Sequence, residues 1–331
     1  MRGWQNISSE KRFWHGAIPC RGLLVRNPGY NTALARRSPL RNHAEAALAR
    51  ALLAALRASG DPVRLARRAL SLYDLAVPRL RAAAWRNFEI AMPELERAAR
   101  ARLLEGCWMN LARVLAMLSR FPQIHAGNVR EFIRYEGIEN YRRAKERGRG
   151  VLIATAHLGN WEFSAFAHAL MTEPMTVVAR PLDNPRLDEL ITRYRTMSGN
   201  RVVGRGQQFL RPLVEALRAN GAVGILIDQN VTADRGVFVD FFGRKACVDA
   251  GFARLAHRSG AAVLLGYALW SDAEQRYVLH FEPEIEITGD VLSDTQALHA
   301  RLEQAVRRAP EQWLWIHRRW KTRPPGEAPL Y

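Results

Sequence analysis

Three short apolar runs, each ending at a polar side chain, constrain the fold of this chain more than any other feature. The runs and the residues that follow them are 151–156 before His157, 175–179 before Arg180, and 222–227 before Asp228. Uncharged runs of this length, separated by helix-like segments, are typical of buried parallel strands. Because the carboxyl ends of parallel strands meet at one edge of a sheet, we expect the three polar side chains to face one ligand-binding crevice.

The order of the segments predicts an α/β fold, in which helices flank a central, mostly parallel sheet. The chain has 331 residues, of which 48% are hydrophobic, so it is large enough for one sizeable core. We expect a single domain over residues 43–325, mainly helical and basic in 43–147 and α/β in 148–325. Residues 1–42 mix Pro, Gly, Asn and Arg, which predicts a poorly ordered basic tail.

The string His-Leu-Gly-Asn-Trp-Glu occupies residues 157–162, directly after the first apolar run. Gly159 and Asn160 suit a turn into a helix, and Glu162 then lies one helical turn beyond His157. From there its carboxylate can reach back to orient the imidazole, and such a pair can remove a proton from a hydroxyl group. The alternative is a structural histidine, with a glutamate that only complements the helix dipole.

This string resembles the H-x4-E box of the bacterial lipid A late acyltransferases, a family that also includes phosphatidylinositol mannoside acyltransferases. Four further blocks are similar to that family in the same order: residues 177–185 with their Arg-Pro pair, 227–230 with Asp-Gln-Asn, 236–243 ending in Phe-Phe-Gly, and 310–321. Together the blocks extend over about residues 85–325. The resemblance implies a lysophospholipid-acyltransferase-like α/β fold.

The resemblance also implies the roles of particular residues. Its catalytic pair is His157 and Glu162, and its substrate-binding residues are Arg180, Asn160, Arg195 and Asp228. Arg180 would hold a phosphate of the acceptor, although a surface ion pair with Asp183 remains the alternative. Asp228 would belong to the active-site region without taking part in proton transfer, or would only cap a loop.

The implied reaction moves a fatty acyl chain from an acyl carrier protein or coenzyme A thioester to a hydroxyl group of a glycolipid, most simply a lipid A precursor. Backbone amides of residues 158–161 would stabilise the oxyanion, and neither a metal nor another cofactor is required. Two alternatives remain open. The acceptor can be another glycolipid, such as a phosphoinositide mannoside or an ornithine lipid, or the chain can be a non-catalytic membrane- or nucleic-acid-binding protein on the same scaffold.

The net positive charge of the chain comes almost entirely from residues 1–150. Residues 1–150 carry 28 Lys and Arg against 12 Asp and Glu, whereas residues 151–331 carry 21 against 20. Basic, leucine-containing helices of this kind favour an anionic membrane surface or an acidic carrier protein. Nucleic acid is not expected as a partner, because the chain has no zinc-finger spacing and no RNA-recognition aromatic motif.

A membrane-spanning helix is not expected either. The longest stretch without Asp, Glu, Lys or Arg has 13 residues, 259–271, and spanning a bilayer takes roughly 20. We therefore expect peripheral or monotopic attachment at the cytoplasmic face of the inner membrane. The tail places Trp313, Trp315 and Trp320 among basic residues, a pattern typical of an interfacial anchor, with ordinary core packing as the alternative.

Two smaller features leave alternatives open. Phe238, Phe241 and Phe242 can line a tunnel for an acyl chain or belong to the core. Cys247 stands soon after them, where the resembled family usually carries a Thr, and a small buried Cys is favoured over a nucleophile. The three cysteines of the chain include no C-x-x-C pair, so neither a disulfide framework nor a zinc site is indicated.

Overall fold

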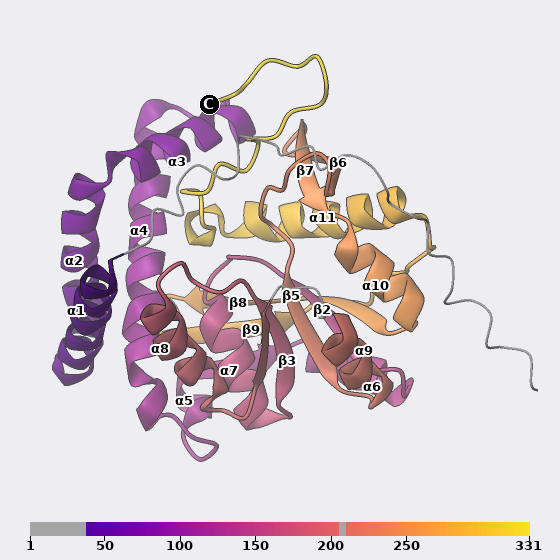
Figure 1. Cartoon of the computed structure of the whole chain (residues 1–331), viewed down its shortest axis with the longest axis horizontal. Coiled ribbons are helices and arrows are strands. Elements are labelled where there is room, and N and C mark those ends of the chain that lie inside the picture. Colours follow the sequence, from indigo (N-terminus) through magenta and orange to yellow (C-terminus); the bar gives the residue numbers. More distant parts are fainter. Residues whose placement is uncertain (1–37, 205–209) are drawn as a thin grey trace, which may run out of the picture. The chain divides into compact units, whose positions relative to one another are not determined.

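A seven-stranded, mostly parallel sheet forms the centre of the fold (Figure 1). The computed structural model describes residues 38–204 and 210–331. The strands of the sheet are β1 (Ile133–Glu136), β2 (Val151–Thr155), β3 (Met175–Ala179), β4 (Arg201–Gly204), β5 (Ala222–Leu226), β8 (Ala262–Ser271) and β9 (Arg276–Phe281). Their order is β1-β9-β8-β2-β5-β3-β4, and every neighbouring pair is parallel except β8 and β9. The α/β fold predicted from the sequence is therefore confirmed.

The three apolar runs are β2, β5 and β3, which lie side by side in the sheet. Successive side chains of a strand point to opposite faces, and β2 supplies both cores in this way. Leu152 and Ala154 belong to one hydrophobic cluster, and Val151 and Ile153 belong to the other. Since both faces are covered, the strands have no need for alternating polar residues, which explains why they appear as continuous apolar runs.

Helices cover the two faces of the sheet. The helices are α1 (Pro39–Ala58), α2 (Pro62–Ala76), α3 (Pro78–Ala91), α4 (Arg97–Arg120), α5 (Val129–Phe132), α6 (Ile138–Glu146), α7 (Trp161–Met171), α8 (Pro185–Thr196), α9 (Leu210–Arg218), α10 (Gly251–Ser259) and α11 (Val291–Arg308). The cluster of Val151 and Ile153 includes residues of α6, α7 and α8, whereas the cluster of Leu152 and Ala154 includes residues of α9, α10 and α11. The long helix α4 contributes to both clusters.

The basic first part of the chain is helical, as predicted. Helices α1, α2 and α3 each begin at a proline, and Asp61 caps α2 by accepting a hydrogen bond from the backbone N of Arg64 at 2.9 Å. Helix α1 already begins at Pro39, inside the segment assigned to the tail, while residues 1–37 of that expected tail lie outside the described residues. Among the described helices, none is both long and apolar enough to cross a bilayer.

The tryptophans of the C-terminal segment are buried, so the expectation that they form an interfacial anchor is wrong. Trp313, Trp315 and Trp320 are at most 3% exposed. Their rings pack against Phe241 and Phe242, at the turn of the hairpin formed by β6 (Gly236–Phe241) and β7 (Arg244–Asp249). The physical reason is that these large aromatic side chains bury much apolar area in the hydrophobic cluster that also contains Phe241 and Phe242.

A buried amide fixes this segment to α3. Asn87, with no exposed surface, donates from Nδ2 to the carbonyl oxygens of Trp315 at 2.5 Å and His317 at 2.7 Å. The backbone of a segment without regular secondary structure needs such partners when it is buried. Asn87 therefore fixes the position of the tryptophan-containing segment relative to α3.

We predict that Asn87→Ala lowers the free energy of unfolding by about 2–4 kcal/mol, because the buried carbonyl group of Trp315 and the partly buried one of His317 lose their donor. Chemical denaturation monitored by tryptophan fluorescence measures the change. Gln304→Ala, on the exposed side of α11, is the matched control and should change stability by less than about 0.5 kcal/mol. Equal stability of Asn87→Ala and wild type would contradict this account of the segment.

Candidate active site

His157 and Asp228 meet at the carboxyl edge of the sheet, where the sequence placed both side chains, although it gave Glu162 as the partner of His157. His157 follows β2 and Asp228 follows β5, and the two strands are direct neighbours. Nδ1 of His157 lies 2.9 Å from Oδ1 of Asp228, and the backbone N of His157 donates to Oδ2 at 2.9 Å. Trp313 donates a third hydrogen bond to this carboxylate, from Nε1 to Oδ2 at 2.9 Å.

The hydrogen bond to Asp228 determines the tautomer of the neutral imidazole. A carboxylate only accepts, so Nδ1 carries the proton and Nε2 keeps its lone pair. Burial lowers the pKa of His157, but the charge of Asp228 and its hydrogen bond raise that pKa by more, and the net pKa lies above the ordinary 6.5. Burial raises the pKa of Asp228, yet His157 and the donated hydrogen bonds hold it well below its usual range. The pair therefore joins an anionic carboxylate to a base of increased strength.

The turn after His157 is held by backbone contacts. Gly159 has φ +62°, and a Cβ atom there would lie 1.9 Å from the carbonyl oxygen of Ala268, so only glycine fits. The amide of Gly159 donates to the carbonyl of Gln312, and the amide of Asn160 donates to that of Ala268, both at 2.8 Å. Two of the backbone amides expected to serve the oxyanion are therefore already engaged in the structure. Asn110 on α4 adds hydrogen bonds to Gly159 and Gln312.

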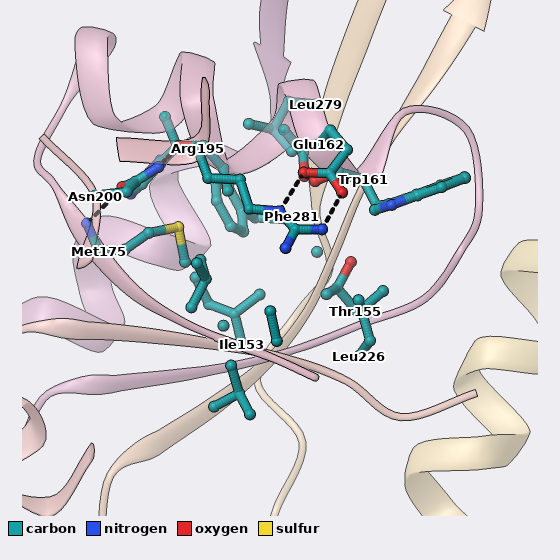
Figure 2. Close-up of a pocket in the computed structure, with 18 residues that line it drawn as sticks. Ile153, Thr155, Trp161, Glu162, Met175, Arg195, Asn200, Leu226, Leu279 and Phe281 are labelled. Carbon is teal, nitrogen blue, oxygen red and sulfur yellow. Dashed lines mark hydrogen bonds and ion pairs between the residues drawn. The ribbon is translucent and has the colours of Figure 1, made fainter. Parts of the chain in front are cut away.

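Glu162 is paired with Arg195 instead of His157. Its carboxylate accepts two hydrogen bonds from the guanidinium, at 2.9 Å to Oε2 and 2.6 Å to Oε1 (Figure 2). The orienting contact expected from Glu162 thus comes from Asp228, because the neighbouring strand brings Asp228 to hydrogen-bond distance, whereas Glu162 on α7 pairs with α8. The charge of Glu162 still contributes to the raised pKa of His157. The catalytic role of Glu162 stays a prediction.

The other predicted substrate residues differ in their surroundings. Asn160 is fully buried and caps α7, because its Oδ1 accepts from the backbone N of Phe163 at 3.0 Å. Arg180 lies at the end of β3, with 77% of its side chain exposed, and forms the surface ion pair with Asp183 that was the alternative reading. The structure therefore gathers Asn160 and Arg195 near the pair and leaves Arg180 at the surface.

An apolar pocket lies between the sheet and helices α7 and α8 (Figure 2). Its walls include side chains of β2, β3, β5 and β9, with glycines at positions 224 and 266 of β5 and β8. Trp161 lines the pocket and its ring also packs edge-on to His157, with 5.0 Å between ring centroids. The pocket therefore adjoins the His157–Asp228 pair, with the ion pair of Glu162 and Arg195 as its main polar element.

Sequence reasoning missed two residues of this site. Trp313 was assigned to the membrane surface, yet its indole N–H is a donor to Asp228. Asn110 carries no signal in the sequence, since a lone asparagine in a helix is seldom distinctive. A polar side chain in the middle of an otherwise apolar helical face was the only available indication.

We predict that Asp228→Asn lowers the pKa of His157, because the neutral amide no longer favours the imidazolium. An NMR titration of the His157 ring measures the value. Glu162→Gln is the matched control: it removes a charge nearby but no hydrogen bond to His157, so its shift should be the smaller one. A larger shift in Glu162→Gln would instead identify Glu162 as the partner that matters.

Known proteins share these sequence features. The family model of the bacterial lipid A biosynthesis acyltransferases matches residues 39–322. The lipid A biosynthesis palmitoleoyltransferase of Escherichia coli (strain K12) is 31% identical over 250 residues, which cover 74% of this chain and 80% of that protein. The lipid A biosynthesis lauroyltransferase of the same strain is 29% identical over 253 residues, 74% of this chain and 80% of that protein.

A phosphatidylinositol mannoside acyltransferase of Mycolicibacterium smegmatis is also similar. It is 28% identical over 222 residues, which cover 66% of this chain and 72% of that protein. The family model extends over most of the described residues and includes His157, Glu162 and Asp228. With its mostly parallel sheet and the histidine at the sheet edge, the chain belongs to the bacterial lipid A biosynthesis acyltransferase family.

Proposed function

We propose that this protein transfers a fatty acyl chain from a thioester donor to a hydroxyl group of a membrane glycolipid, with His157 as the general base. The observation that carries the proposal is the hydrogen bond between His157 and the buried Asp228 beside an apolar pocket. Membership of the family supports the reaction class, and relatives named for lipid A biosynthesis favour a lipid A precursor as acceptor.

The proton transfer follows from the tautomer of His157. Nε2 takes the proton of the acceptor hydroxyl while the hydroxyl oxygen bonds to the thioester carbonyl carbon. When the carbon–sulfur bond breaks, the departing thiolate receives that proton, so an ester and a free thiol are formed. Asp228 stabilises the intermediate imidazolium, which is the role that the buried carboxylate has in Ser-His-Asp triads.

The developing oxyanion requires donors near His157. Of the amides of residues 158–161, those of Gly159 and Asn160 already donate to carbonyl groups, which leaves Leu158 and Trp161. We assign the amide of Trp161, because it lies in the first turn of α7. Amides in the first turn of a helix have no acceptor within the helix and point toward a site of negative charge. Fewer backbone amides are therefore proposed as oxyanion donors than the four of residues 158–161 that were expected from the sequence.

The apolar pocket is the proposed site of the acyl chain. Its lining is mainly aliphatic and aromatic, and it adjoins His157 through Trp161. Arg195 and Glu162 lie in the same pocket wall, where a polar thioester or acceptor group would meet them. We further propose that Arg180 binds an acceptor phosphate, because an exposed ion pair such as that with Asp183 contributes little and exchanges readily.

Donor and location are part of the same proposal. An acyl carrier protein or coenzyme A supplies the thioester, and the protein works at the cytoplasmic face of the inner membrane through peripheral contact. The excess of arginine in residues 1–150 supports contact with an anionic surface. A second acceptor class remains because a similar relative is named for phosphatidylinositol mannoside, and an ornithine lipid would offer comparable chemistry.

Mass spectrometry of glycolipids tests the proposal. Purified protein is incubated with membrane extract and a mixture of acyl-carrier-protein and coenzyme A thioesters, beside its His157→Ala form. We predict a product heavier by one acyl chain, formed about 10²–10⁴-fold more slowly by the variant.

A protein without catalytic function on this scaffold gives a different result. It would form no acylated glycolipid, while wild type and His157→Ala would bind anionic vesicles equally well. That outcome would favour the non-catalytic alternative.

A further inference from the structure

We propose that Met175 limits the length of the acyl chain that the pocket accepts. The inference rests on the proposed function, because it concerns the chain-binding part of the same site. Met175 begins β3 and is 6% exposed, and its thioether reaches into the pocket from the side of Asn200 (Figure 2). Nothing in its residue type distinguishes it in the sequence from other core methionines.

The tip of the Met175 side chain occupies the space above Gly224, which has no side chain. A Cβ atom added to Gly224 would lie 2.9 Å from Cε of Met175 and 3.8 Å from Cγ1 of Val177. Gly224 pairs with Val177 on one side and with Ile153 on the other, and all three residues line the pocket. The methyl group of Met175 therefore lies over Gly224, between the paired residues Ile153 and Val177 that also line the pocket.

The position of Met175 relative to His157 makes it suited to limit length. Thr155 and Leu226 form one row of the sheet next to His157, and the tip of Met175 lies over Gly224, two residues earlier on β5. Two residues of a strand extend about 7 Å, so the tip lies about 7 Å farther from His157 than that row. An acyl chain whose thioester lies near His157 and whose tail runs back along the strands therefore meets Met175 near the far end of the pocket.

The backbone of Met175 is held in place by hydrogen bonds, whereas its side chain can change conformation. Asn200 accepts a hydrogen bond from the backbone N of Met175 at 2.9 Å and donates to the carbonyl oxygen of Ala165 on α7 at 3.0 Å. This bridge fixes the start of β3 relative to the helix that covers the pocket. The unbranched thioether, by contrast, has several rotatable bonds and adapts to neighbouring groups. The length of acyl chain that the pocket accepts therefore depends on the size and conformation of the Met175 side chain.

Competition among acyl donors of graded chain length tests the inference. Wild type, Met175→Ala and Gly224→Ala each receive an equimolar mixture of thioesters with membrane extract, and mass spectrometry gives the distribution of transferred chains. We expect Met175→Ala to shift the preferred chain upward by about two or three methylene groups, roughly the volume that the side chain loses. Gly224→Ala should shift it downward, because the added methyl group displaces the tip of Met175 into the pocket.

Matched controls separate this effect from a loss of stability. Met117→Ala removes a methionine that is 8% exposed in the same hydrophobic cluster but does not line the pocket. Gly204→Ala adds a methyl group to a strand glycine whose nearest neighbour would be Pro181 at an ordinary 3.6 Å. Both controls should keep the wild-type distribution. Unchanged distributions in Met175→Ala and Gly224→Ala would overturn the inference.

A second measurement does not depend on turnover. Thermal shifts caused by free fatty acids of increasing length should reach their maximum at a longer chain in Met175→Ala than in wild type. If wild type transfers no chain of any length, the proposed function fails, whereas length-dependent binding that moves with Met175 still supports the pocket. If binding shows the same length dependence in both proteins, the inference fails whatever the activity.

Discussion

The buried carboxylate of Asp228 is the group on which the arrangement of the site depends. It is 3% exposed, and an isolated carboxylate in such a place would be costly. Two donors from His157 and one from Trp313 compensate for the lost hydration. Because these donors lie far apart in the chain, the carboxylate connects the ends of β2 and β5 with the C-terminal segment.

The strands and their polar ends could be predicted from the sequence because both properties are local. A continuous apolar run indicates a strand covered on both faces, and the polar residue after it marks the ligand-binding edge. The partner of His157 was not local. Glu162 lies close in sequence, but the pairing of β2 with β5 is decided by the order of strands in the sheet, and that order brought Asp228 to the imidazole.

The tryptophans and the arginines show why composition is a weak guide to surfaces. Trp313 and Trp315 have a pattern typical of a membrane interface, yet core packing took precedence. Arg57 on α1 likewise donates to the backbone of Ser119 on α4 and to Tyr194 on α8, so part of the basic first half of the chain holds helices of the fold together. On α2, Arg68, Leu72 and Leu75 are exposed, which leaves a mixed basic and apolar face available to an anionic surface.

The dependence of the acyl-transfer rate on pH tests the central claim most directly. If His157 is the base and Asp228 its partner, the rate rises with pH through a pKa above 6.5, because the neutral imidazole is the active form. In Asp228→Asn the pKa of His157 falls, so the same rise should occur at lower pH and reach a lower plateau. A rate that rises at the same pH in wild type and Asp228→Asn would contradict the account.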